Sequence, residues 1–211
     1  MNAGTQIETA NAAPDTGLVI PATRYNEGAF GQRFPASRFM IGDRWATAVW
    51  IMGNNYKGSG YYGAYPPAYV PRIYSMFPEP ERILHLFSGS LTKEGVAHPC
   101  TEVFRLDLNP KYQPDFVQDA EAMALPDNCF DLILADPPYS EEDAKRYGRP
   151  LCDRNRVLAE CHRILSKDGY LVWLDQSQPM YSKTYWQWVG VISVLRSTNH
   201  RVRAAFFFRP A

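Results

Sequence analysis

The chain has 211 residues, carries 22 basic and 22 acidic side chains for a formal net charge of zero, and is 45% hydrophobic. This size predicts one globular domain whose core needs no disulfide staples. No apolar run reaches the roughly 18 residues of a membrane span, and the first residues lack a signal-peptide pattern, so we expect a cytoplasmic protein with no membrane partner. The four scattered cysteines lack zinc-ligand spacing, so we expect no metal site.

The charges are unevenly distributed along the chain. Basic residues dominate residues 21–75 and the segment after Asp175, whereas acidic residues concentrate in residues 115–143. This pattern leaves two interpretations open: a basic face that binds a polyanion, or solvated arginines on separate faces.

The N-terminal part of the chain shows little regular pattern. Residues 1–25 are predicted to be a disordered tail, and residues 26–80 an extension before the core. Within the extension, residues 56–74 are rich in Tyr, Gly and Pro, which favours an ordered loop over a helix or strand.

Residues 81–211 have the regular pattern of an α/β core. Apolar runs predict strands at residues 83–87, 102–108, 130–136 and 170–175, and a helix with a stop at residues 167–169 precedes the last of these. Residues 189–195 and 201–208 predict a closing antiparallel hairpin, turning at residues 196–200. The expected fold is a mostly parallel twisted sheet with helices on both faces, which binds ligands beyond the carboxyl ends of its strands.

Polar or small residues follow each of these strand ends. A turn with Ser88 and Gly89 follows the first strand and could bring backbone N–H groups to a ligand, Asp107 ends the second and is suited to ribose hydroxyls, and Asp119 could accept from an adenine amine. Each also has a structural explanation, since Asp107 could cap a helix and Asp119 could begin a turn. Their common order in one domain favours a nucleotide-like ligand.

The third strand ends in Asp136-Pro137-Pro138-Tyr139. Two consecutive prolines terminate a strand, but a terminator needs neither the acid nor the aromatic ring. An exocyclic amine on an aromatic base is a poor nucleophile because its lone pair is delocalised. Asp136 and the Pro137 carbonyl could accept its two N–H bonds while Tyr139 stacks on the base, and no covalent nucleophile is required.

The sequence resembles the amino-methyltransferases that use S-adenosylmethionine (SAM), with the DNA adenine-N6 and cytosine-N4 methyltransferases most similar. The resemblance rests on LFSGS, RLDLNP, QDAEAMALPDNCFDLILADPPY and GAYPPAYVPRI, and it departs from the family where Leu91 replaces the second Gly of Phe-x-Gly-x-Gly. It implies a Rossmann-like class I fold and the catalytic residues Asp136, Pro137, Pro138 and Tyr139. The cofactor-binding residues that it implies are Tyr65, Pro66, Phe87, Ser88, Gly89, Ser90, Asp107, Leu108, Asp119, Ala120 and Asp136.

No segment of the size of a separate target-recognition region accompanies this core. The basic loop at residues 141–156 could contact phosphates or close over the base, so the resemblance implies a compact, phage-like DNA methyltransferase that acts on adenine N6 in a short or single-stranded site, or one that relies on a homodimer or a recognition partner. The alternatives are an N-methyltransferase acting on RNA, which is the weaker candidate, or on cytosine N4, and a non-catalytic nucleic-acid-binding relative.

Overall fold

The computed structural model describes residues 38–42, 45–52, 65–77, 79–98, 101–196 and 202–211. The predicted tail at residues 1–25, the turn at residues 197–200, Cys100 and Arg201 lie outside these ranges. Among the described residues, no helix is both long and apolar enough to span a bilayer.

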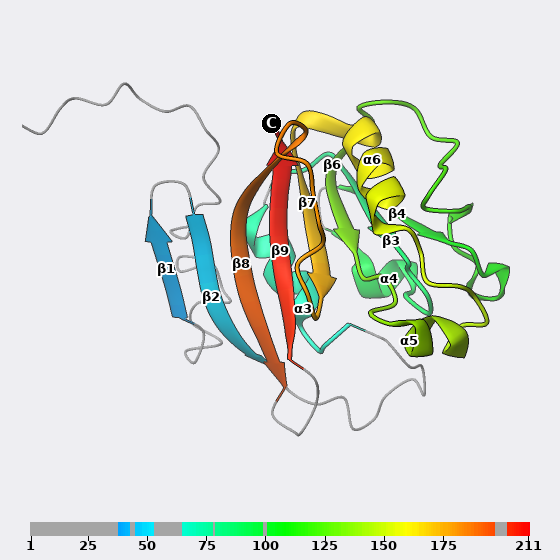
Figure 1. Cartoon of the computed structure of the whole chain (residues 1–211), viewed down its shortest axis with the longest axis horizontal. Helices are drawn as coiled ribbons and strands as arrows, with labels where there is room; N and C mark the ends of the chain where they lie inside the picture. Colours follow the sequence, from blue (N-terminus) through cyan, green and yellow to red (C-terminus); the bar gives the residue numbers. More distant parts are fainter. Residues whose placement is uncertain (1–37, 43–44, 53–64, 78, 99–100, 197–201) are drawn as a thin grey trace, which may run out of the picture.

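A single mixed sheet forms the centre of the molecule (Figure 1). Its strand order is β1-β2-β8-β9-β7-β6-β3-β4-β5. The pairs from β7 through β6, β3 and β4 to β5 are parallel, as is β2 with β8, whereas β9 runs antiparallel to both β7 and β8, and β1 runs antiparallel to β2. The strands are β1 (Arg38–Gly42), β2 (Trp45–Met52), β3 (Arg82–Leu86), β4 (Glu102–Asp107), β5 (Phe116–Val117), β6 (Phe130–Ala135), β7 (Leu165–Asp175), β8 (Trp186–Arg196) and β9 (Arg203–Pro210).

Helices cover both faces of this sheet. In Figure 1, α6 lies in front of the sheet and α3 lies behind it. The alternation of the strands supplies the two core layers: Val172 and Leu174 of β7 pack in the cluster that contains α3, and Leu171 and Trp173 pack in the cluster that contains α6. The helical elements are α3 (Tyr69–Met76), α4 (Lys93–Val96), the 3-10 turn η1 (Pro110–Tyr112), α5 (Glu141–Arg146) and α6 (Arg154–Ile164).

The fold class expected from the sequence is confirmed. Each of the predicted core strands is present, and the closing pair β8 and β9 is antiparallel. The sheet is therefore that of a Rossmann-like α/β protein, with parallel strands on one side and an antiparallel insertion by β9 on the other.

The prediction of a loop through residues 56–74 is wrong for its last part, which is helix α3, while residues 56–64 lie outside the described ranges. Ala68 adopts a positive φ of 63° at the helix start, and Pro71 falls in the first turn, where a missing N–H is tolerated. Tyr69, Ile73 and Met76 are buried at helical spacing. The tyrosines and prolines that indicated a loop therefore form the start and the buried face of a helix.

The predicted helix stop at residues 167–169 is also wrong. Helix α6 ends at Ile164, and β7 begins directly at Leu165. Gly169 lies inside the strand at a register shift opposite Phe130–Leu132, and a Cβ there would lie 2.8 Å from the side chain of Leu165. Gly169 is thus required by close packing within a strand.

Candidate active site

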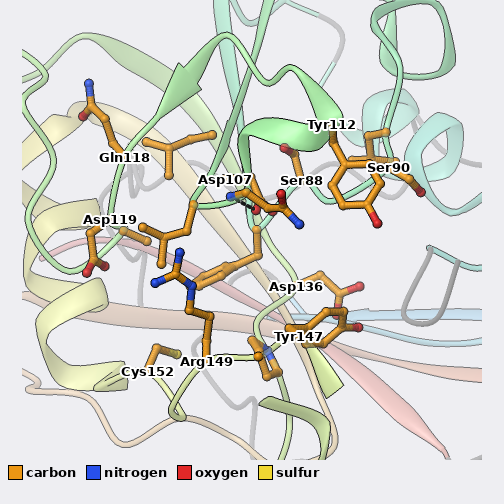
Figure 2. A pocket seen from close by; sticks show the side chains of 18 of the residues that line it. Ser88, Ser90, Asp107, Tyr112, Gln118, Asp119, Asp136, Tyr147, Arg149 and Cys152 are labelled. Carbon is orange, nitrogen blue, oxygen red and sulfur yellow. Dashed lines mark hydrogen bonds between the residues drawn. The ribbon is translucent and has the colours of Figure 1, made fainter. Parts of the chain in front are cut away.

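The carboxyl ends of β3, β4 and β6 border one cavity of about 730 Å³. Because these three strands are parallel neighbours, the residues that follow them meet at one edge of the sheet. Figure 2 shows Asp107 between Asp119 on one side and Asp136 on the other. The structure thus brings together the strand-end residues singled out in the sequence.

Most of the predicted cofactor-binding residues line this cavity. The lining includes Tyr65, Phe87, Ser88, Ser90, Asp107, Leu108, Asp119, Ala120 and Asp136. Pro66 and Gly89 do not line it, but they are buried and directly follow the lining residues Tyr65 and Ser88 in the chain. Of the four predicted catalytic residues, Asp136 and Pro138 also line it, whereas Pro137 and Tyr139 do not.

The turn after β3 is shaped by positive φ angles at Phe87 and Gly89, 57° and 49°. The amide of Ser88 donates to the Leu106 carbonyl at 3.1 Å, which ties the turn to β4. The Ser88 hydroxyl is buried and, among the described residues, has no hydrogen-bond partner. It lines the cavity, so a ligand there could satisfy it.

Asp107 connects the turns that follow β3 and β4. Its Oδ2 accepts from the Gly89 amide at 2.7 Å, and its Oδ1 accepts from the Asn109 amide at 2.8 Å. A carboxylate oxygen has capacity for more than one hydrogen bond, so both can still accept from ligand hydroxyls. Asp107 is not a helix N-cap, because it is Asn109 that caps the following 3-10 turn.

Leu91, in the place of the second family glycine, does not distort the turn. It is not among the described residues with positive φ, so this position makes no conformational demand for glycine. Its carbonyl accepts from Nη1 of the buried Arg105 at 2.8 Å, and the same guanidinium binds Asp115 and the Gln113 carbonyl. The departure from the family pattern is therefore accommodated.

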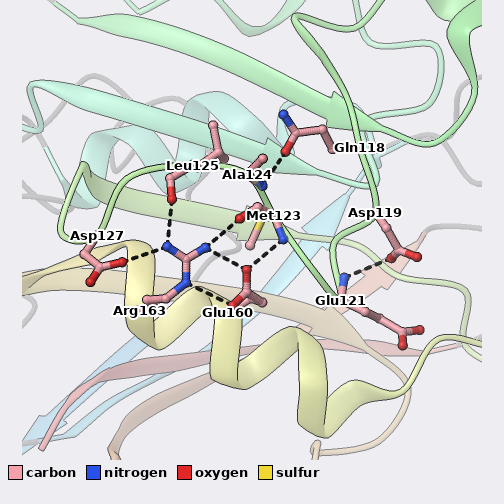
Figure 3. Close-up of polar contacts among 9 residues, drawn as sticks. All are labelled: Gln118, Asp119, Glu121, Met123, Ala124, Leu125, Asp127, Glu160 and Arg163. Carbon is pink, nitrogen blue, oxygen red and sulfur yellow. Dashed lines mark hydrogen bonds and ion pairs between the residues drawn. The ribbon is translucent and has the colours of Figure 1, made fainter.

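The loop that carries Gln118 and Asp119 is fixed by Arg163 of α6 (Figure 3). Arg163 donates to the carbonyls of Leu125 and Met123 at 2.7 Å and pairs with Asp127 and Glu160. Within the loop, Gln118 accepts from the amide of Ala124, and Asp119 accepts from the amide of Glu121 at 2.9 Å. Asp119 does begin a turn, since its carbonyl accepts from the amide of Ala122 at 3.1 Å, and the residue lines the cavity (Figure 2).

Asp136 and Tyr139 form a hydrogen-bonded pair at the end of β6. The Tyr139 hydroxyl donates to Oδ1 of Asp136. Burial raises the pKa of Asp136 to about 6, and the nearby Arg203 cation and the hydrogen bond from Tyr139 oppose this shift. The Arg203 guanidinium lies over the Tyr139 ring, with its Cζ 5.2 Å from the ring centroid.

Arg154, one of the bases expected to contact phosphates, is engaged inside the protein. Its Nη2 lies 3.0 Å from Oδ2 of the fully buried Asp175 and donates to the carbonyls of Pro138 and Tyr139. The predicted basic loop is largely helix α5 and the start of α6, where Arg146 pairs with Glu142, and Arg156 with Glu121. Lys145 and Arg149 remain exposed, and Arg149 borders the cavity.

Several residues near the site were not identified from the sequence. Tyr69, Arg203, Asp175 and Arg163 come from α3, β9, β7 and α6, and each depends on tertiary contacts. Of these four residues, only Asp175 could have been found from the sequence, because it is an acid at the end of an apolar strand. Asp136 has a similar position, directly after the last residue of β6. Within the described residues, no group of three or more His, Cys, Asp or Glu side chains is arranged to hold a metal ion.

Comparison with known proteins adds one family match. A model described as "Methyltransferase domain" matches residues 88–173, which include the turn after β3, Asp107, Asp119 and Asp136–Tyr139. A type II methyltransferase, M.BglII of Bacillus subtilis, is 34% identical over 70 residues, or 31% of this chain. The matched segment spans about a fifth (19%) of that relative's length.

Solved structures with similar folds have low sequence identity. The 1,6-didemethyltoxoflavin-N1-methyltransferase of Burkholderia thailandensis is 13% identical with a TM-score of 0.49, covering 67% of this chain and 76% of that one. The PH0226 protein of Pyrococcus horikoshii is 13% identical with a TM-score of 0.46, covering 67% of this chain and 87% of that one.

The cavity suits the cofactor that the domain match indicates. The carboxylate of Asp107 can accept from ribose hydroxyls, the buried Ser88 hydroxyl lacks a partner among the described residues, and Leu106 and Ala120 provide apolar lining. The domain match, the fold and these residues together support a methyltransferase that uses SAM as its methyl donor.

Proposed function

We propose that this chain transfers the methyl group of SAM to the exocyclic N6 amine of adenine in DNA. The observation that carries the proposal is the position of Asp136. Its carboxyl group lines the cofactor cavity and is hydrogen-bonded to Tyr139, the aromatic residue at the end of the same segment. A carboxylate placed between a methyl donor and an aromatic platform is suited to hold an aromatic amine.

The chain's own residues would prepare the amine. Asp136 accepts one N–H of the amine and the Pro137 carbonyl accepts the other, which localises the nitrogen lone pair for attack. SAM, when bound, supplies an electrophilic methyl group. The nitrogen loses a proton as it is methylated, and ionised Asp136 is the acceptor in direct contact with it.

The rest of the motif would fix the geometry. Pro137 and Pro138 restrict the backbone and offer no competing N–H. Arg154 holds the carbonyls of Pro138 and Tyr139 in place. Positioning of this kind accounts for much of the rate gain in a displacement reaction.

A nucleic-acid substrate is supported by the similarity to a type II methyltransferase and by the Asp-Pro-Pro-Tyr sequence. The base must leave its stack to reach Asp136, and this costs less in single-stranded or distorted DNA. We therefore expect relaxed or short-site methylation that is fastest on single strands.

The test is methylation by the full chain with isotope-labelled SAM in separate pools of single-stranded DNA, duplex DNA, RNA and free nucleosides, followed by mass spectrometry of the nucleosides. We expect N6-methyldeoxyadenosine from DNA, and none with the Asp136→Ala variant. Label in N4-methyldeoxycytidine, or in RNA alone, would replace the adenine-in-DNA assignment. SAM binding without transfer to any pool would overturn the proposal.

The exposed bases near the cavity provide a second check. If Lys145 and Arg149 contact phosphates, the double variant with both changed to Ser should weaken binding to all sequences alike and reduce the salt slope, by roughly 0.7–0.9 in log–log terms for each lost contact. Lys167→Ser, an exposed change on β7, is the matched control. An altered sequence preference in the double variant would show that these side chains read bases.

A further inference from the structure

Unmatched polar atoms gather around Asp136. The hydroxyls of Tyr65 and Tyr69 and Nη1 of Arg203 are buried and, within the described part of the chain, have no hydrogen-bond partner. Buried polar atoms are nearly always hydrogen-bonded. A group of them beside one catalytic residue indicates a ligand that supplies the partners.

The contacts place these residues around Asp136 and Tyr139. The rings of Tyr65 and Tyr69 stack, with centroids 5.0 Å apart and an interplanar angle of 25°. Arg203 lies over the Tyr139 ring, and Tyr139 donates to Asp136. Asp136 also acts electrostatically on Tyr65, Tyr69 and Arg203, which places all of them close to its carboxyl group.

This group is separate from the cofactor cavity. Among the described residues that line the cavity are Tyr65 and Asp136, whereas Tyr69, Tyr139 and Arg203 do not line it. Asp136 therefore belongs both to the cavity lining and to the group of Tyr69, Tyr139 and Arg203. A substrate amine held by Asp136 would therefore lie beside this group as well as beside the methyl donor.

The chemistry of Arg203 identifies the part of the substrate that it meets. A guanidinium has only donors, so Nη1 requires an acceptor. A phosphate would have to lie beside the Asp136 carboxylate, and like charges repel. A neutral acceptor on the same ring as the target amine meets both conditions, and in adenine this is N1, directly next to the N6 amine.

We infer that Arg203 is a specificity-determining residue that donates to the ring nitrogen next to the methylated amine, which is N1 of adenine. The inference rests on the proposed function. The Arg203 guanidinium lies over the Tyr139 ring, so a base that stacks on this ring would lie within reach of its N–H groups. Arg203 thereby reads the edge while Asp136 holds the amine.

The experiment compares a single-stranded oligonucleotide that contains one target adenine with the same strand carrying 1-deazaadenine, in which a C–H group replaces N1. Initial rates are measured at subsaturating DNA for the wild type, Arg203→Met and Arg203→Lys, with Lys167→Met as a surface control. We expect the wild type and Lys167→Met to prefer adenine by about 10- to 100-fold, the range for one hydrogen bond to a charged group. Arg203→Met should slow adenine methylation by a similar factor and methylate the two strands at rates within about twofold.

The controls separate the possible failures. SAM binding and thermal unfolding show whether each variant is folded, and equal rates of the wild type on the two strands overturn the inference without any variant. An Arg203→Met variant that keeps the full preference for adenine also overturns it, and shows that Arg203 acts on Asp136 or on stability alone. Absence of N6-methyladenine with the natural strand overturns the proposed function as well.

Discussion

Arg154 at the start of α6 forms an ion pair with Asp175 at the end of β7, with 3.0 Å between Nη2 and Oδ2. The same nitrogen donates to the carbonyls of Pro138 and Tyr139, at 3.4 Å and 3.2 Å. Asp175 is completely buried and accepts in addition from Trp173 Nε1 at 3.2 Å and from the Gln176 amide. One cation thus joins a core carboxylate to the backbone of the proposed catalytic segment.

Removing this cation should weaken both the fold and the site. Arg154→Met leaves a buried carboxylate without its ion-pair partner, a change that costs roughly 3–5 kcal/mol in typical cases. We expect a loss towards the lower end, because Trp173 and backbone amides still donate to Asp175. Urea unfolding measures the loss, and Arg154→Lys should recover part of the stability.

Arg156→Met is the matched control, since Arg156 lies in the same helical turn, is itself exposed and pairs with Glu121 at 3.7 Å. Its expected effect is within about 0.5 kcal/mol. If Arg154→Met lost equally little stability and kept full methyl transfer, Arg154 would not be needed to hold the Pro138–Tyr139 backbone in place.

The pKa of Asp136 makes stability depend on pH. Burial raises this pKa from 3.8 to about 6, so the native protein binds the proton more tightly than the unfolded chain does. The stability that this proton contributes is fully present below about pH 4 and is lost as pH rises through about 6.

Asp136→Asn, which mimics the protonated acid, should therefore be more stable than the wild type at pH 8, by about 1–3 kcal/mol from about 1.4 kcal/mol per pKa unit. The two should be equally stable at pH 3.5. Denaturant titrations across this range provide the measurement, and parallel stability curves would show that Asp136 is not buried as described.

Tyr139→Phe should shift the pH dependence of methyl transfer. The Tyr139 hydroxyl stabilises ionised Asp136 and so lowers its pKa. Without it, the pKa of Asp136 rises further, and the acidic limb of the rate profile should move above its wild-type midpoint near pH 6. Because the ring remains for stacking, the rate on the plateau should fall far less than in Tyr139→Ala. A Tyr139→Phe profile that matched the wild type would show that this hydrogen bond does not act on Asp136 during the reaction.

Asp107→Ala should weaken SAM binding. The carboxylate orients the Gly89 and Asn109 amides and remains able to accept from the cofactor. We expect a loss of about 1–3 kcal/mol in binding free energy, the cost of unmatched polar partners. Isothermal titration calorimetry measures this loss, with Asp115→Ala as a control for damage to the neighbouring loop through Arg105. An Asp107→Ala variant that binds SAM with wild-type affinity would place the cofactor elsewhere.

Arg163→Met should loosen the loop that carries Asp119. Its guanidinium satisfies the carbonyls of Met123 and Leu125 and holds Glu160, which accepts from the Met123 amide at 2.7 Å. Hydrogen exchange should rise at residues 119–125, and SAM affinity should fall because the loop must be ordered again on binding. Arg82→Met is the control, since Arg82 has an exposed ion pair with Glu102 at the far end of β3. Unchanged exchange in the loop would show that its own turns suffice to order it.

The meeting of the β3, β4 and β6 ends at one cavity could be predicted from the sequence, because each of these strands has a clear sequence pattern. Buried parallel strands are continuous apolar runs, and Asp107 and Asp136 stand where such runs stop. The carboxyl ends of parallel strands lie at the same edge of a sheet, so the sequence alone predicts that residues far apart in the chain meet there.

The rest depended on packing that periodicity does not encode. In β2, Ala48 and Trp50 are buried while Val49 and Ile51 are exposed, and a strand that is apolar on both faces lacks the alternation that marks one. The sequence pattern suggests that Arg203 and Arg154 are surface residues. In the folded chain, however, Arg203 lies over the Tyr139 ring and Arg154 pairs with Asp175.

The position of β9 in the sheet has a consequence for how the chain folds. This strand is late in the sequence but lies between β7 and β8, so the β1-β2-β8 side joins the β3–β7 side through it. Pairings between distant segments form slowly because loop closure precedes any gain. A nascent chain can therefore assemble the cavity edge from β3, β4 and β6 first. It acquires Arg203, and with it the proposed substrate group, only when β9 inserts and closes the sheet.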